Sequence, residues 1–150
     1  MTMLVLGAAL WFVAHLLPSV APGLRGRLMS IGEGPYKGLF ALTIVGSLLL
    51  IIFGWRAAVP SMVYAEPDWG RVVNMAAMLA ALILFAVALF KTNIKRYIRH
   101  PQLTSILLWS VGHLLANGDS RSVVLFGAMG VWSVIAMLAI NRRDGAWQKP

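Results

Sequence analysis

The sequence predicts an all-α integral membrane protein, a polytopic bundle of about five transmembrane helices in a single domain over residues 1–150. Of its residues, 59% are hydrophobic and 12% are charged, whereas soluble domains carry about 25% charged residues. The mean hydropathy is +0.78. The apolar residues also gather in long runs, which links rich in Pro, Gly and basic residues separate.

The first apolar run, residues 3–17, predicts a retained helix, because it lacks the basic segment that begins a secretory signal peptide. It is shorter than the roughly 20 residues that cross a bilayer. Either the helix continues through Pro18, or it lies in a locally thinned bilayer. The link that follows, Ser19 to Lys37, has the composition of a loop, with an interfacial helical turn expected around Leu24 to Ile31.

The second predicted helix covers residues 38–55, with Tyr36 and Trp55 placed like interfacial aromatic residues at its two ends. Within this helix, Gly46 and Ser47 would allow another helix to approach closely. The three remaining helices are predicted at 71–90, 101–117 and 123–140.

The fourth predicted helix has recognisable end signals. It opens with Pro101, a favourable first-turn residue, and Asn117-Gly118 indicates a left-handed end.

Basic residues predict the orientation. Three of the 13 Lys and Arg residues, Arg56, Arg71 and Arg121, fall on one side of the predicted topology, and the others fall on the opposite side. The positive-inside rule then places the amino terminus outside and the carboxyl terminus in the cytoplasm. The net charge of +8 is therefore expected to meet membrane lipid, and no nucleic acid partner is expected.

The sequence has no cysteine, which excludes thiolate ligands for a metal. Its three histidines are the only good nitrogen ligands. The pattern Leu-Trp-x-Val-small-His-Leu-Leu occurs twice, and it matches Trp11 with Trp109 and His15 with His113. In the predicted topology these two helices are antiparallel, and each histidine lies about 20 Å along its helix from the face where that helix enters. If these two helices are neighbours, the Cα atoms of His15 and His113 would lie about 13 Å apart. Two histidines that hold one haem iron from opposite sides need a Cα separation of about 12 to 13 Å.

The sequence therefore admits a haem whose iron is held by His15 and His113, with Trp11 and Trp109 as walls of the pocket. A second interpretation stays open, because a Trp and a His one turn apart in a membrane helix also form an interfacial ring and an interhelical hydrogen bond.

Two further polar residues have two interpretations each. His100, beside Pro101 and among basic residues, would cap a helix or meet a lipid phosphate, or it would contact an acidic group such as a haem propionate. Asn117 would build the turn with Asp119, or it would orient His113, one turn earlier, as an outer partner of a metal ligand.

Three segments, HPQLTSILLWSVGHLLANGD, GEGPYKGLF and the early AHLLP, resemble the NnrU family, and the similarity covers nearly the whole chain. The resemblance implies that His15 and His113 match the axial-ligand positions of the family and that His100 matches another family histidine. Bacterial members are associated with denitrification and nitric-oxide metabolism. The plant relative, zeta-carotene isomerase, is a haem b membrane protein that isomerises a cis double bond when its iron is reduced.

The implied function is a redox or cis–trans isomerase-like role with haem b, acting on a hydrophobic substrate such as a carotenoid or on nitric oxide, with a redox partner. A non-enzymatic factor for the assembly or regulation of nitrite and nitric-oxide reductases is the alternative. The Arg99-His100-Pro101 triplet is similar to a motif of membrane methyltransferases of the isoprenylcysteine carboxyl type, which bind S-adenosylmethionine. The triplet makes a methyltransferase-like protein a third hypothesis. It ranks below the other two because the later acidic pair of those enzymes is not found here.

Overall fold

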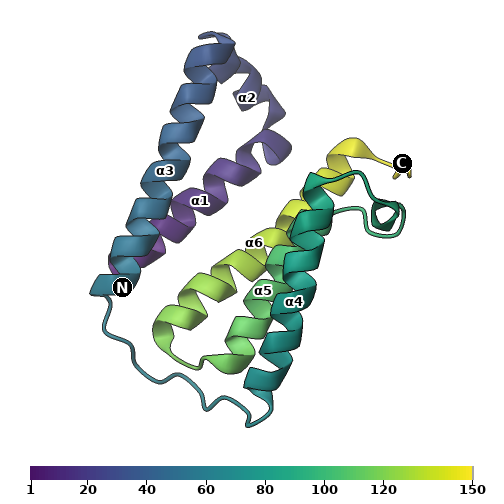
Figure 1. Cartoon of the computed structure of the whole chain (residues 1–150). Helices are drawn as coiled ribbons and strands as arrows, with labels where there is room; N and C mark the ends of the chain where they lie inside the picture. The colour runs from purple at the N-terminus through teal and green to yellow at the C-terminus, as the bar shows by residue number, and fades with distance from the viewer. Residues whose placement is uncertain (150) are drawn as a thin grey trace. The chain divides into compact units, whose positions relative to one another are not determined.

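The computed structural model describes residues 1–149, and this part of the chain is helical throughout except for links and one isolated β-bridge (Figure 1). The chain forms two compact units, residues 1–59 and 60–150. The elements are α1 (Thr2–Val20), α2 (Pro22–Met29), α3 (Glu33–Ala57), α4 (Gly70–Leu89), the 3₁₀ helix η1 (Asn93–Arg96), α5 (Pro101–Ala116) and α6 (Ser120–Asp144). The predicted all-α membrane fold is confirmed.

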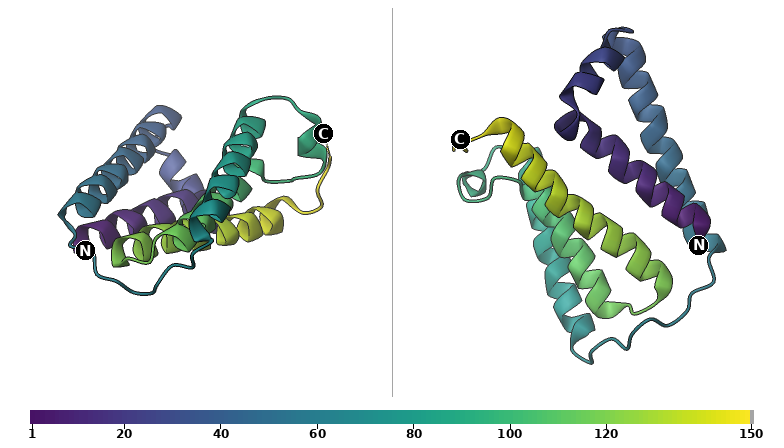
Figure 2. Two further views of the ribbon diagram at one scale, coloured as in Figure 1. Left: turned by 60° about the horizontal axis from the view of Figure 1, so that its bottom comes forward. Right: turned by 180° about the vertical axis from the view of Figure 1, so that it is seen from behind.

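In the first unit, α1 and α3 pack side by side and antiparallel, and the short α2 lies at the end where the chain passes between them (Figures 1 and 2). Two glycines allow the backbones to touch. A Cβ atom on Gly7 would lie 2.7 Å from the backbone nitrogen of Ile51, and one on Gly54 would overlap the backbone of Leu4. Leu4 is fully buried in this contact. The pair is thus joined by small residues, as is typical of helices within membranes.

The sequence placed the close contact of this helix elsewhere, and half of that prediction was wrong. Ser47 is fully buried, and its hydroxyl donates to the carbonyl oxygen of Ile44 at 2.7 Å. A Cβ atom on Gly46, however, would meet nothing within 4 Å. Gly46 points away from the neighbouring helix, and Gly54, two turns further on, makes the approach instead.

Two helices of the first unit extend beyond their predicted ends. α1 continues through Pro18 to Val20, the first of the two predicted alternatives, and α2 takes the place of the expected interfacial turn. α3 begins at Glu33, since an acidic residue in the first turn is favoured by the helix dipole and a proline is tolerated there. An ion pair between Glu33 and Lys37, 2.7 Å long, also lies in this turn.

The second unit is a three-helix arrangement in which α5 packs against both α4 and α6 and runs antiparallel to each (Figure 2). Small and hydroxyl-bearing residues form both contacts. The Ser105 hydroxyl donates to the carbonyl oxygen of Ala81 on α4 at 2.7 Å. A Cβ atom on Gly112 would lie 2.7 Å from Asn74 Oδ1, also on α4. Buried serines line the helix contacts of this unit: Ser105, Ser110, Ser122 and Ser133.

Residues 61–64, which we call the clamp segment, run beside the turn that joins α5 to α6. Met62 forms an antiparallel bridge with Asp119, and the amide of Ser120 donates to the carbonyl of Ser61 at 2.8 Å. The amide of Val63 donates to the carbonyl of Gly118 at 2.8 Å. The clamp segment therefore fixes this turn through its backbone.

The predicted left-handed end at Asn117-Gly118 was wrong. Asn117 is extended, with φ −143° and ψ 113°, and among the described residues only Gly32 and Gly145 have a positive φ. Gly118 is required for a different reason: a Cβ atom there would overlap the carbonyl group of Tyr64. The glycine serves the close approach of the clamp segment.

In the described part of the chain, four helices, α1, α3, α4 and α6, are long and apolar enough to cross a membrane. α5 has 16 residues and a rise of about 24 Å. Because α5 runs back between α4 and α6, it returns through the layer that these two helices span. The total is close to the five predicted crossings.

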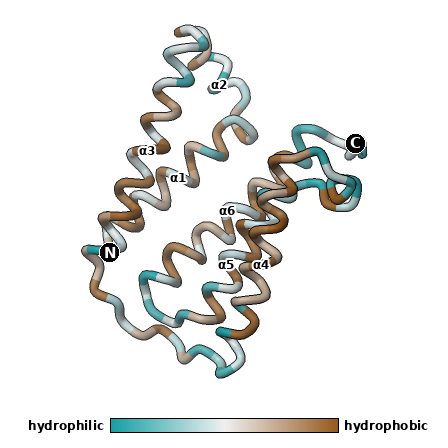
Figure 3. Tube along the Cα trace, in the orientation of Figure 1, coloured by the Kyte–Doolittle hydropathy of each residue, from teal (hydrophilic) through white to brown (hydrophobic). Residues whose placement is uncertain are grey.

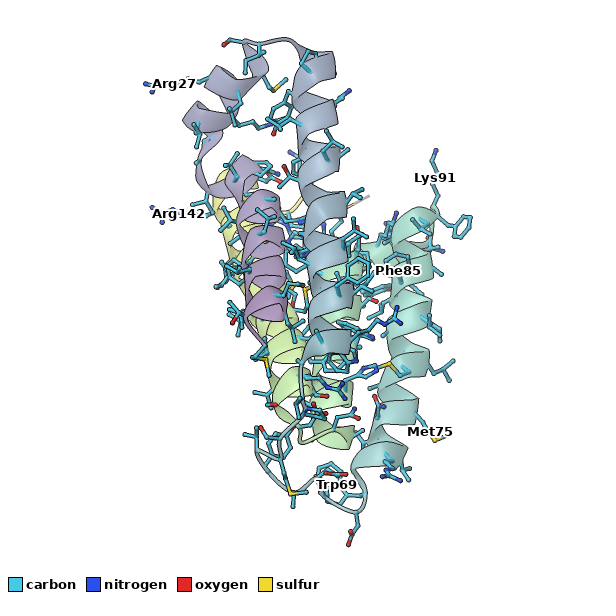
Figure 4. The ribbon with its side chains drawn as sticks, turned by 90° about the vertical axis from the view of Figure 1, so that its left-hand side faces the viewer. Arg27, Trp69, Met75, Phe85, Lys91 and Arg142 are labelled. Carbon is cyan, nitrogen blue, oxygen red and sulfur yellow. The ribbon has the colours of Figure 1, made fainter. Side chains whose placement is uncertain are left out.

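The surfaces of these helices are apolar, as lipid contact requires. Hydrophobic residues dominate the tubes of the long helices in Figure 3. On α4, Met75 projects outward and is 73% exposed. Trp69 and Lys91 lie at the two ends of this helix (Figure 4), where an aromatic ring and a cation suit the membrane interface.

Candidate functional site

The first unit places His15 on α1 in a cluster of aromatic rings. Its ring centroid lies 4.1 Å from that of Trp11, one turn earlier, and 5.8 Å from that of Phe40 on α3, which it meets edge-on. The Nδ1 atom of His15 lies 3.0 Å from the carbonyl oxygen of Trp11. The imidazole is thus oriented by its own helix and flanked by a ring of the paired helix.

The second unit repeats this arrangement around His113 on α5. The ring centroid of Trp109 lies 5.2 Å away, and Phe126 of α6 stacks on the imidazole at 4.3 Å. Phe126 is itself buried, with 6% of its surface exposed. The Nδ1 atom of His113 lies 2.8 Å from the carbonyl oxygen of Trp109. Both histidines therefore have a Trp one turn before them and a Phe from the helix that pairs with theirs.

These hydrogen bonds assign the ring protons. A carbonyl oxygen can only accept, so Nδ1 of His15 and of His113 must be the protonated nitrogen. In the neutral ring Nε2 then carries the lone pair, and a carbonyl bonded to Nδ1–H fixes the tautomer and the orientation of the ring. This is the arrangement that imidazole ligands of metals commonly have.

His100 is held differently and lies elsewhere. It is the residue before α5, and its Nε2 atom bonds Asn141 Oδ1 of α6 at 2.8 Å. Beside it, Arg99 donates to the carbonyl of Gly145 at 2.9 Å. Both side chains line an open pocket of about 450 Å³ that also includes Asp144 and Trp147. His100 thus links the beginning of α5 to the end of α6, about 20 Å along α5 from His113.

Asn117 ends α5, and its side chain reaches the backbone rather than the ring of His113. Its Nδ2 donates to the carbonyl oxygen of His113 at 2.9 Å. The hydroxyl of Tyr64, in the clamp segment, lies 2.9 Å from the Asn117 carbonyl oxygen and also contacts that of Leu114. Burial, together with the nearby carboxylates of Glu66 and Asp119, raises the pKa of Tyr64, which keeps this hydroxyl protonated.

Asp119 immediately precedes α6 and caps it. Its carboxylate accepts from the amides of Arg121 and Ser122 and, at 2.6 Å, from the Ser122 hydroxyl. Burial opposes ionisation, but these hydrogen bonds and the Arg121 guanidinium outweigh it and lower the pKa of Asp119.

The profile of a known family, described as NnrU protein, matches residues 3–150. The chain belongs to the NnrU family. The match runs through both units and includes all three histidines of this NnrU protein. No curated protein and no solved structure matches the chain.

Within the NnrU protein, the structure brings together Trp11 with His15 in the first unit, and Trp109, His113 and Asn117 in the second. It places His100 at the far end of α5 from His113. Sequence reasoning did not find Phe40, Phe126 or Tyr64. Phe and Tyr are common in apolar sequences, and only pairing of the helices shows which of them meets a histidine.

Proposed function

We propose that this NnrU protein binds haem b through His15 and His113 as axial ligands and has a redox or isomerase-like role. The observation that carries the proposal is the shared state of the two imidazoles. Each has Nδ1–H bonded to the carbonyl of a tryptophan one turn earlier, so that Nε2 has the lone pair that iron takes.

The chemistry of the surrounding residues fits the group. A haem with two histidine ligands needs an apolar surrounding, and each histidine lies in an apolar helix beside a Trp and a Phe. When bound, haem would supply one-electron chemistry and a coordination site for nitric oxide or for a double bond of a hydrophobic substrate.

The residues of the chain orient and shield the ligands. Trp11 and Trp109 hold the ring protons through their backbone carbonyls, which fixes the direction of Nε2. Phe40 covers one flank of the His15 imidazole, and Phe126 covers one flank of the His113 imidazole. His100 is assigned to the contact between α5 and α6, since Asn141 engages its Nε2.

The spectrum of the purified protein tests this proposal. In mild detergent, the wild type is expected to show a Soret band with the sharp reduced bands of a haem with two histidine ligands. His15→Ala and His113→Ala should each weaken or displace these bands. His100→Ala is the matched control and should retain them. A folded, colourless wild-type protein would rule out the haem.

The location of the protein is part of the same proposal. Four membrane-crossing helices and the distribution of Lys and Arg support an inner-membrane protein with its amino terminus outside and its carboxyl terminus in the cytoplasm. This orientation is tested with two single-cysteine variants, Ser61→Cys and Gln148→Cys, whose thiols are labelled in intact cells. Only the first should react with an impermeant reagent.

The pocket at Arg99 and His100 supports a second candidate, a methyltransferase-like protein that binds S-adenosylmethionine there. Arg99 already donates to the carbonyl of Gly145, and Nε2 of His100 is already bonded to the side-chain oxygen of Asn141. Binding of S-adenosylmethionine that depends on Arg99 and not on His15 would favour this candidate. A protein that binds neither haem nor S-adenosylmethionine would favour the remaining hypothesis, a non-enzymatic factor for the assembly or regulation of nitrite and nitric-oxide reductases.

A further inference from the structure

Two carbonyl groups in the last turn of α5, those of His113 and Leu114, have side-chain donors from outside the helix. A helix leaves its last four carbonyl groups without partners of its own, and in α5 these belong to residues 113–116. The side chain of Asn117 donates to the carbonyl of His113. The Tyr64 hydroxyl lies between the carbonyls of Leu114 and Asn117 and can donate its single proton to either. One tyrosine thus contacts both the final turn and the residue that ends it.

Tyr64 is itself held in place by the backbone. Its amide, like that of Val63, donates to the carbonyl of Gly118, at 3.2 Å. The side of Gly118 that faces Tyr64 has no room for a Cβ atom. Because Ser61 also bonds Ser120 at the start of α6, the clamp segment fastens both helices at this end. The hydroxyl therefore reaches α5 from a fixed position.

The His113 ring depends on this end of α5. It stacks on Phe126, which belongs to α6, so a small rotation or slide of the last turn of α5 would change the stacking and the direction of Nε2. The Asn117 side chain bonds the backbone of His113, and the Tyr64 hydroxyl bonds the backbone of Asn117. The two bonds form a chain from the clamp segment to His113.

We propose that Tyr64 is a positioning residue for His113: its hydroxyl fixes the last turn of α5 and so sets the direction of the ligand nitrogen. This inference rests on the proposed role of His113 as a haem ligand. Tyr64 does not contact the imidazole, and it acts through backbone carbonyls only. Its raised pKa supports the assignment, because the phenol remains a donor throughout the physiological range.

The test uses Tyr64→Phe in the full-length protein, since this change removes the hydroxyl and keeps the ring. Tyr97→Phe is the matched control, because Tyr97 is 81% exposed. Tyr64→Phe should retain haem but shift its midpoint potential and alter the low-spin electron paramagnetic resonance signal, which reports the orientation of the axial imidazoles. Tyr97→Phe should change neither.

A second measurement is independent of haem. In protein prepared without haem and labelled with ¹⁵N-histidine, Tyr64→Phe should move the imidazole signals of His113 and leave those of His15 unchanged, because the carbonyls that the Tyr64 hydroxyl contacts lie at the end of α5. Wild-type potential, resonance and His113 signals in Tyr64→Phe would overturn the inference while the haem proposal stands. A wild type without haem would overturn the haem proposal, and the His113 signals would then decide whether Tyr64 positions the ring.

Discussion

The imidazole of His113 on α5 and the phenyl ring of Phe126 on α6 stack with their centroids 4.3 Å apart and their planes 20° from parallel. Phe126 also meets Trp109 edge-on at 4.8 Å. A single ring from α6 thus contacts both aromatic members of the motif on α5. The stack joins the two helices at the histidine itself, and changes at Phe126 should be felt there.

Replacing Phe126 by Leu should lower the free energy of unfolding. Aromatic pairs contribute about 0.5–1.5 kcal/mol beyond the area they bury, and Phe126 takes part in two ring contacts. Thermal unfolding in detergent measures the loss. Phe85→Leu is the control, because Phe85 lies on the outer surface of α4, 42% exposed. Equal losses in the two variants would contradict the special role of the stack.

Replacing Gly112 by Ala should separate α4 from α5. The new Cβ atom would lie 2.7 Å from Asn74 Oδ1 and 3.0 Å from Ala77 Cβ, and such overpacking costs about 1–3 kcal/mol. A Cβ atom on Gly127 of α6 meets nothing within 4 Å. Gly127→Ala should therefore leave stability unchanged or raise it by about 0.4–1 kcal/mol. Chemical denaturation in mixed micelles compares the stabilities of the two variants. A Gly112→Ala variant as stable as the wild type would show that α4 and α5 can move apart without cost.

The first unit offers a matched pair on one helix. Gly54→Ala should weaken the contact of α1 with α3, because the added carbon overlaps the backbone of Leu4. Gly46→Ala should be tolerated, since that face of α3 is open. Protease resistance of the two variants in detergent is a sufficient measurement. If Gly46→Ala were the more damaging change, the observed pairing of α1 with α3 would be wrong.

The stability of the α5–α6 turn should fall in acid. The pKa of Asp119 is lower in the folded protein than its ordinary value, so the folded state favours the carboxylate. Its contribution is complete above the ordinary pKa of about 3.9 and is lost as the pH falls below it, through the lowered pKa of the folded state. Asp119→Asn still caps α6 but does not titrate.

Melting temperatures measured between pH 6 and pH 3 test this dependence. The wild type should lose more stability than Asp119→Asn over this range. Asp119→Ala should be less stable than the wild type by about 1 kcal/mol at neutral pH, since it removes the cap. Parallel acid profiles for the wild type and Asp119→Asn would assign the acid sensitivity to other groups.

Much of the fold could be predicted from hydrophobic runs. The observed α5 differs from its predicted range, 101–117, by one residue, because Pro101 and the polar turn mark its ends. α6 begins three residues before the predicted 123 and ends four residues after the predicted 140. The polar Ser120 to Ser122 form a capped first turn, and Asn141 to Asp144 continue the helix beyond its apolar part. Composition does not show a helix that extends into polar residues.

The site was less accessible to sequence reasoning. The repeat of Trp and His predicted which rings belong together within each helix, because residues four apart share a helix face. Phe40 and Phe126 could not be chosen from among the six Phe residues of the chain, since each meets its histidine through helix packing. Tyr64 could not be chosen either, because its contact with Asn117 spans 53 positions of the sequence.

The brevity of α5 has a consequence for the lipid around the second unit. α6, with 25 residues, rises about 37 Å, which exceeds the hydrocarbon thickness of about 30 Å, whereas the roughly 24 Å of α5 falls short of it. The headgroup layer must dip toward the ends of α5, or polar groups of the chain must occupy that depth. His100 and Asn117 stand at those two ends. Bilayers of shorter acyl chains should stabilise this protein where the headgroup layer dips, and should leave its stability unchanged where His100 and Asn117 occupy that depth.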